Sequence, residues 1–161
     1  MRWRWVVLAL AAALFAAAPG RAAAQNADSR EIAAYRLTEA TLAKYLRASG
    51  ALAAVPKPAS ADADDDAEDA DDPSIAQIAA KYDSIPAARR AISAAGLTTR
   101  EYVVFTFALF QAGMGAWVVE QQGWSKLPPD VARANVEFYQ RHKAQIDSVT
   151  AELKNRDDDP T

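Results

Sequence analysis

Apolar residues recur with the period of an α-helix along most of the chain from residue 37 onward. Thr38 is suited to the N-cap of a first helix, and Leu37 and Leu42 stand at the two positions of a hydrophobic staple. The apolar stripe continues to Gly50, a residue type that commonly ends helices. We expect residues 30–37 to extend this helix towards the N-terminus, with an irregular arm as the alternative.

The pattern predicts a longer helix at about 99–122. Thr98 and Glu101 fit a capping box at its start. Residues 102–119 are apolar on nearly every face, which is typical of the buried centre of a helical bundle or of a membrane span. Their number lies at the lower edge of the length that crosses a bilayer, and the neighbouring helices are amphipathic and need a surface to pack on. We therefore expect a buried central helix and no stable membrane span in the mature chain.

Three further patterns complete the predicted fold. A cap and a first-turn proline at 72–73 start a short helix, and Pro86 starts the next. A last helix is expected to begin with Asp130 as its cap and to end near Leu153. The predicted fold class is all-α: an antiparallel bundle of four to five helices around the central hydrophobic helix, with a disordered acidic loop.

The N-terminus has the composition of an export signal. Residues 2–5 carry two arginines, 6–18 are an unbroken apolar run, and 22–24 offer the small residues that a signal peptidase reads. Thirteen apolar residues make about 20 Å of helix, too short for a bilayer core of about 30 Å. We expect residues 1–24 to be a cleavable signal peptide and the mature protein, periplasmic or secreted, to begin at Gln25; an uncleaved anchor is the alternative.

Charge separates residues 56–72 from the rest of the chain. The chain has 18 basic and 21 acidic residues, and eight of the acids fall within this segment, which has no large apolar residue. Like charges at this density repel, and nothing offsets the entropy of ordering, so we expect a disordered acidic linker. It would divide the first helix of the domain, within 25–55, from the remaining helices at 73–154. Residues 155–161 would be a flexible tail.

Composition removes several classes of function. Without cysteine the chain has no thiolate metal site and no thiol nucleophile. No basic face suggests a nucleic-acid partner. The single histidine has no evident carboxylate ligands for a metal ion beside it and no serine and acid placed for a catalytic triad. We therefore expect no catalytic residue, no metal and no cofactor.

Polar residues interrupt the apolar stripe of the last helix. Asn135 and His142 share a helix face with Phe138 and Ile146, and Gln111 of the central helix is a candidate partner for them. One interpretation is a buried hydrogen-bond network, because an unsatisfied buried polar group costs about 1–3 kcal/mol. The other is the polar floor of a ligand pocket between helices. On the second interpretation Asn135, His142 and Gln111 are the candidate ligand-binding residues.

A haem-type cofactor is an alternative because exported helical bundles include b-type cytochromes whose iron is ligated by methionine and histidine. Met114 and His142 are the one such pair in the mature chain. The chain lacks a Cys-x-x-Cys-His motif, so covalent attachment of haem is excluded.

The segments at 35–38 (YRLT), 96–103 (GLTTREYV) and 134–143 (ANVEFYQRHK) resemble parts of a group of small exported bacterial proteins of unknown function. The resemblance covers about half of the mature chain and implies a periplasmic or secreted helical domain, without a catalytic role for any residue. We expect a non-catalytic exported envelope protein that binds an unidentified protein partner or a small apolar ligand. An enzyme or a haem-type bundle that uses the polar residues around His142 is the alternative.

Overall fold

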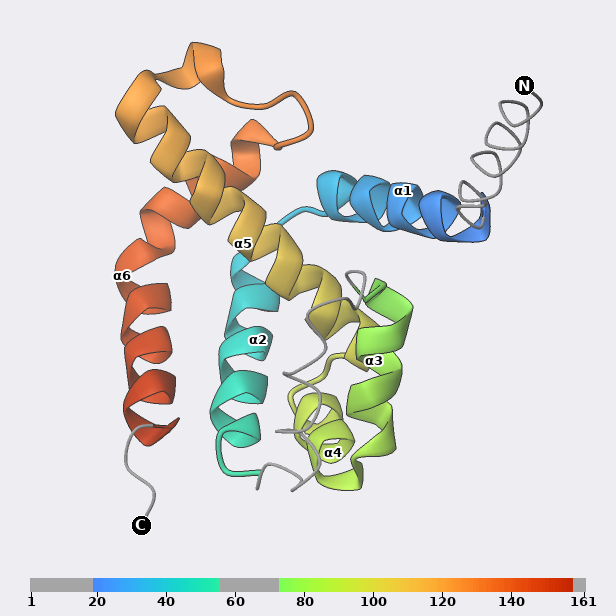
Figure 1. Cartoon of the computed structure of the whole chain (residues 1–161). Helices are drawn as coiled ribbons and strands as arrows, with labels where there is room; N and C mark the ends of the chain where they lie inside the picture. Colours follow the sequence, from blue (N-terminus) through green and yellow to red (C-terminus); the bar gives the residue numbers. More distant parts are fainter. Residues whose placement is uncertain (1–18, 56–72, 158–161) are drawn as a thin grey trace, which may run out of the picture.

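The computed structural model describes residues 19–55 and 73–157, and the side chains within 25–55 and 73–150. Within these ranges the chain is all-α and has no strand, as the sequence predicts (Figure 1). The described residues form six α-helices, more than the four to five expected. In chain order the elements are α1 (Pro19–Ala34), α2 (Glu39–Leu52), α3 (Ile75–Ser84), α4 (Pro86–Ala94), α5 (Thr99–Gln122), the 3-10 helix η2 (Trp124–Lys126) and α6 (Arg133–Asp157).

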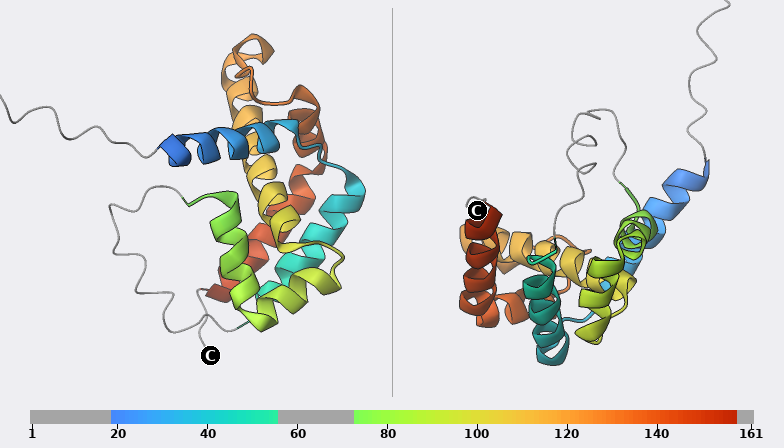
Figure 2. Two further views of the ribbon diagram at one scale, coloured as in Figure 1. Left: turned by 90° about the vertical axis from the view of Figure 1, so that its right-hand side faces the viewer. Right: turned by 90° about the horizontal axis from the view of Figure 1, so that it is seen from below.

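Helix α5 is the centre of the fold, which confirms the predicted central helix. It contacts each of the other α-helices and η2. Helices α2 and α6 pack on one side of it, α3 and α4 lie against its first turns, and α1 crosses it (Figures 1 and 2). Phe105 and Ala108, on its inner side, are both 0% exposed. Burial of such side chains is the main source of stability for a chain without disulfides.

The core consists of clusters that α5 shares with its neighbours. The largest joins the start of α2, the middle of α5 and the first part of α6. It is made of Leu37, Leu42, Phe105, Ala108, Leu109, Ala112, Phe138 and Ile146. A second cluster surrounds Tyr102, whose ring stacks on Tyr45 with centroids 5.1 Å apart. A third joins α3 to Val103 and Val104 of α5.

Two helices start at the predicted capping residues. Thr98 Oγ1 accepts a hydrogen bond from Glu101 N at 3.1 Å, and Glu101 Oε2 accepts one from Thr98 N at 2.9 Å. Thr38 is the N-cap of α2. Leu37 and Leu42 lie in one core cluster, as a hydrophobic staple requires. Local sequence therefore determines where α2 and α5 begin.

The expected extension of the first helix through residues 30–37 is wrong. Helix α1 ends at Ala34, and Thr38 is extended, with φ −134° and ψ 157°. In this conformation the Thr38 side chain accepts a hydrogen bond from the first turn of α2, which it could not do inside a continuous helix. Asn135 of α6 hydrogen-bonds the backbone between the two helices and so compensates for the helical hydrogen bonds that are lost.

The expected end of the first helix and the expected cap of the next also differ from the structure. Helix α2 continues through Gly50 to Leu52, since a glycine inside a helix costs only about 1 kcal/mol. Helix α3 is capped by Ser74, whose Oγ accepts a hydrogen bond from Gln77 N at 3.3 Å. The predicted cap, Asp72, lies outside the described residues.

The last helix is displaced from its predicted bounds. Helix α6 begins at Arg133, and Asp130, the expected cap, lies in a turn that precedes the helix. It ends at Asp157, beyond Leu153, so residues 155–157 of the expected tail are helical.

Some sequence predictions concern residues 1–18, 56–72 and 158–161, which lie outside the described residues. They are the apolar part of the signal peptide, the acidic linker and the end of the tail. Helix α1 begins at Pro19, within the expected signal peptide, and continues across the expected cleavage point before Gln25.

Candidate functional site

Three large apolar side chains are exposed in one row on α5. Phe110 is 67% exposed, Met114 51% and Trp117 55%. Their spacing of four and three residues places them on the same face of the helix. No other large hydrophobic side chain is exposed among those that the structure describes. We call these three residues the α5 ridge.

The ridge occupies the second half of a helix face whose first half is buried. Val103 lies on the same face, two turns before Phe110, and is 2% exposed because it packs with Ile75 of α3. On the opposite face, Ala112 packs with Phe138 of α6. The ridge is therefore the part of α5 that its neighbours leave uncovered.

Two grooves lie beside the ridge, and Gly113 and Tyr139 line both of them. The first, of about 370 Å³, lies between the ridge and Ile146 of α6. The second, of about 590 Å³, lies between Trp117 and Lys143. Because they share two lining residues, we treat them as one feature, the α5–α6 groove.

The glycine at 113 makes room for the ring of Tyr139. A Cβ atom at this position would lie 3.2 Å from both Cε2 and Cζ of Tyr139, closer than most such contacts. The ring therefore lies directly against α5 and forms a boundary common to both parts of the groove. The ring thus fills the space above Gly113, and the hollow next to the projecting ridge is the α5–α6 groove itself.

Charges of both signs lie at the Trp117 end of the groove. Glu120 and Lys143 line it, and Lys143 forms an ion pair with Asp147. The hydrogen bond and charge of Asp147, and more weakly the charge of Glu120, raise the pKa of Lys143. Lys143 therefore remains cationic throughout the physiological range.

The groove combines the apolar side chains of the ridge with the polar residues Tyr139, Glu120 and Lys143. The described residues hold no group of three or more histidine, cysteine, aspartate or glutamate side chains that could bind a metal ion. His142, the one histidine of the chain, lines neither part of the groove. Met114 does line it, so the groove does not contain the methionine–histidine pair that a haem-type site would need.

Asn135, the first of the candidate ligand-binding residues, is 3% exposed and lies against the connection between α1 and α2. Its Nδ2 donates a hydrogen bond to the carbonyl oxygen of Tyr35 at 2.8 Å, and its Oδ1 accepts one from Leu37 N at 3.1 Å. Both ends of the side-chain amide are thus engaged by backbone groups. Asn135 therefore attaches the connection between α1 and α2 to helix α6.

His142 and Gln111 lie apart from Asn135 in the hydrogen-bond network. The ring of His142 packs on Phe138 with centroids 4.3 Å apart, and its Nε2 lies 3.8 Å from Glu39 Oε1. Gln111 is half-buried on α5. No hydrogen bond or ion pair joins these three candidates to one another among the described side chains, and their ligand-binding role stays a prediction.

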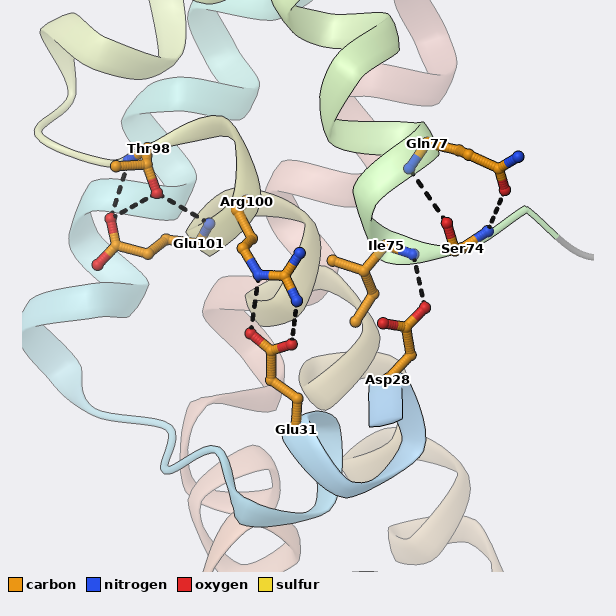
Figure 3. Close-up of polar contacts among 8 residues, drawn as sticks. All are labelled: Asp28, Glu31, Ser74, Ile75, Gln77, Thr98, Arg100 and Glu101. Carbon is orange, nitrogen blue, oxygen red and sulfur yellow. Dashed lines mark hydrogen bonds and ion pairs between the residues drawn. The ribbon is translucent and has the colours of Figure 1, made fainter. Parts of the chain in front are cut away.

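Another cavity, of about 630 Å³, lies between α1 and α3 and reaches Phe107 of α5. Asp28 Oδ2 accepts a hydrogen bond from Ile75 N at 2.8 Å, which places a carboxylate at the N-terminus of α3, where the helix dipole favours it (Figure 3). Arg100 Nε donates to Glu31 Oε1 at 3.1 Å, and this contact raises the pKa of Arg100 (Figure 3). Asp28 and Glu31 thus attach α1 to α3 and α5, and each carboxylate already accepts a hydrogen bond within the fold.

No protein-family model, no curated protein and no solved structure matches this chain. The candidate site therefore stands on its own geometry: the α5 ridge and the α5–α6 groove beside it. Sequence reasoning did not find it, because the residues of the ridge belong to a helix that is apolar on nearly every face. The sequence feature that could have indicated the site is the spacing of Phe110, Met114 and Trp117 around Gly113.

Proposed function

We propose that this chain is a non-catalytic exported envelope protein that binds a protein partner through the α5 ridge and the α5–α6 groove. The observation that carries the proposal is the row of three large apolar side chains, each more than half exposed, on the central helix of the fold. Export rests on the signal-like composition of residues 1–24.

The size of the exposed apolar surface supports a binding role. Taking roughly 200 Å² for each full side chain, the exposed fractions leave roughly 350 Å² of apolar surface on the ridge. The largest apolar patch on a typical monomer is about 300–600 Å² and is often functional. Water contact with this surface is unfavourable, at about 25 cal/mol for each Å². A partner that covers the ridge removes that contact.

A protein partner suits this surface better than a small apolar ligand. Ligand pockets enclose about 70–90% of a bound molecule, whereas the ridge projects from the helix and the groove lies to one side of it. Anchors at positions i, i+4 and i+7 of a helix are the pattern by which helices dock on protein surfaces. The small ligand remains the alternative occupant of the groove.

The burial of α5 supports a role outside the membrane. By length and composition alone, Thr99–Gln122 qualifies as a candidate span, with mean hydropathy 1.6, and half of its most apolar window is buried inside the fold. Its contacts with all the other described helices account for that burial. A span would have to give up these contacts in favour of lipid, so we propose that α5 stays a core helix with one face open to a partner.

Site-directed photocrosslinking in cells that produce the chain tests this function. A photoreactive residue replaces Trp117 in one variant and Arg90 in a control variant; Arg90 is exposed on α4, away from the ridge. We expect a discrete crosslinked protein from position 117 that disappears when Phe110→Ser is added, and none from position 90. Absence of a product at position 117, or the same product at both positions, would contradict the proposal.

A further inference from the structure

We infer that the partner is a second copy of this chain, arranged about a two-fold axis with the two α5 ridges in contact. The inference rests on the proposed function and names its partner. Most oligomers of soluble proteins are symmetric assemblies of one chain, and two-fold dimers are the commonest. In such a dimer one surface must be complementary to itself, which sets three requirements: shape, charge and area.

The shape of the face meets the first requirement. A self-complementary surface needs projecting groups and depressions side by side, and here the α5 ridge lies next to the α5–α6 groove. Phe110 and Met114, four residues apart, form the kind of ridge that fits between the side chains of another helix. The depression is the α5–α6 groove beside the ridge, because the ring of Tyr139 fills the space above Gly113. The ridge of one copy can therefore enter the α5–α6 groove of the other.

The charges of the face meet the second requirement. A surface with a large excess of one sign repels an identical copy, because every charge then meets its like. The charged residues that line the groove are Glu120 and Lys143, one of each sign. Because Lys143 is paired with Asp147, the face as a whole carries two acids and one base, an excess of a single negative charge. A lipid surface would instead be favoured by clustered basic side chains, which this face lacks.

The apolar centre of the face supplies nearly half of the third requirement, the buried area. A standard stable interface buries about 800 Å² on each partner. The ridge supplies roughly 350 Å² of apolar surface as the centre of the contact. The half-buried Tyr139 and the exposed parts of the groove lining adjoin this centre and would add to the contact. An apolar centre with a polar edge is the usual composition of an interface.

Analytical ultracentrifugation of the exported protein, purified from the cells that produce it, over a wide concentration range tests the second copy. We expect a reversible monomer–dimer equilibrium whose dissociation constant rises at least about tenfold for Phe110→Ser and for Trp117→Ser, as for residues at the centre of an interface. Arg90→Ser, on exposed α4, should leave it unchanged. Circular dichroism melts check that every variant is folded, and Met114→Lys serves as a third ridge variant.

Methionine-methyl NMR locates the contact in the same samples. The chain has two methionines, Met1 in the expected signal peptide and Met114 in the ridge, so a methyl-labelled sample of the exported protein reports the centre of the ridge directly. We expect the Met114 signal to shift with protein concentration in the wild type and in Arg90→Ser, and to stay constant in Phe110→Ser.

A chain that stays monomeric at all concentrations, or a dimer that the ridge variants leave intact, would overturn the inference. The photocrosslinks formed from position 117 test the proposed function separately. A monomeric chain that crosslinks there to a different protein refutes the second copy and leaves the binding function in place. A monomeric chain without any crosslink refutes both.

Discussion

Asn135 and Tyr35 are 100 residues apart in the chain, and the side-chain amide of the first donates a hydrogen bond to the backbone carbonyl of the second at 2.8 Å. The same amide accepts from Leu37 N. Together the two bonds attach the connection between α1 and α2 to helix α6. They also keep that connection non-helical, since its backbone groups already have partners.

Replacing Asn135 should therefore destabilise the fold. Asn135→Ala leaves Leu37 N and the carbonyl of Tyr35 without their partner, at a cost of about 1–3 kcal/mol in the free energy of unfolding. Gln145→Ala, an exposed position on the same helix that lines neither part of the groove, is the control and should change it by less than about 0.5 kcal/mol. Urea unfolding measures both. Equal stabilities for the two variants would show that the amide does not hold the connection.

Two glycines inside helices should respond in opposite directions to alanine. At Gly115 a Cβ would lie 2.8 Å from Val136 Cγ2 and 2.9 Å from Val131 Cγ1, and β-branched side chains move little. We expect Gly115→Ala to destabilise by about 1 kcal/mol or more, despite the better helix propensity of alanine. Nothing lies within 4 Å of a Cβ at Gly50, so Gly50→Ala should stabilise by about 0.4–1 kcal/mol. Thermal melts of the pair test this, and a shared sign would refute it.

The helix starts were predictable because the groups that define them are close in sequence. Thr98 and Glu101 are three residues apart, and the side chain of each accepts a hydrogen bond from the backbone N–H of the other. This pairing does not depend on what the helix packs against. The break before Thr38 was not predictable in the same way. Thr38 is recognisable in the sequence as an N-cap of α2. The end of α1, however, also depends on the hydrogen bonds of Asn135, a residue that lies near this connection only in the folded protein.

The candidate site was hidden for a related reason. Helix α5 is apolar on nearly every face, so its sequence indicates burial but not which face a neighbour covers. Which part is covered depends on how far α3 reaches along α5. Val103 is covered by α3, and Phe110 on the same face is not. Asn135 and His142 stood out because they are polar on an apolar stripe, yet Asn135 binds backbone and His142 packs on Phe138.

Two phenylalanines of α5 should separate folding from binding. Phe105 is 0% exposed, so Phe105→Ala leaves a cavity in the core and should cost about 3–5 kcal/mol in the free energy of unfolding. Phe110 is 67% exposed, and Phe110→Ala should change it by less than about 0.5 kcal/mol. Denaturant unfolding at low protein concentration compares them. A large loss for Phe110→Ala would mean that the ridge is part of the core of the single chain.

Acid should weaken the start of α5. The hydrogen bonds from Thr98 N and Oγ1 lower the pKa of Glu101 below its ordinary value near 4.5. A group with a lowered pKa in the folded state stabilises fully above its ordinary pKa, and this contribution is lost as the pH falls through the folded value. Glu101→Gln still accepts hydrogen bonds but cannot titrate.

Urea unfolding at a series of pH values, from neutral to below the ordinary pKa of glutamate, compares the wild type with Glu101→Gln. The stability difference between the two should be constant above pH 4.5 and should shrink below it. Parallel pH curves would show that Glu101 is not held by Thr98.

Hydroxyl-radical footprinting of Met114 and Trp117 tests most directly the claim that the α5 ridge is a binding surface. The oxidation of both residues is measured in cells that produce the chain and in dilute purified protein, each relative to Trp124, which lies under the guanidinium of Arg133. A covered ridge predicts oxidation several-fold slower in the cells than in the dilute protein. Equal relative rates in the two samples would show that the ridge stays open to water where the protein works, and would contradict the account.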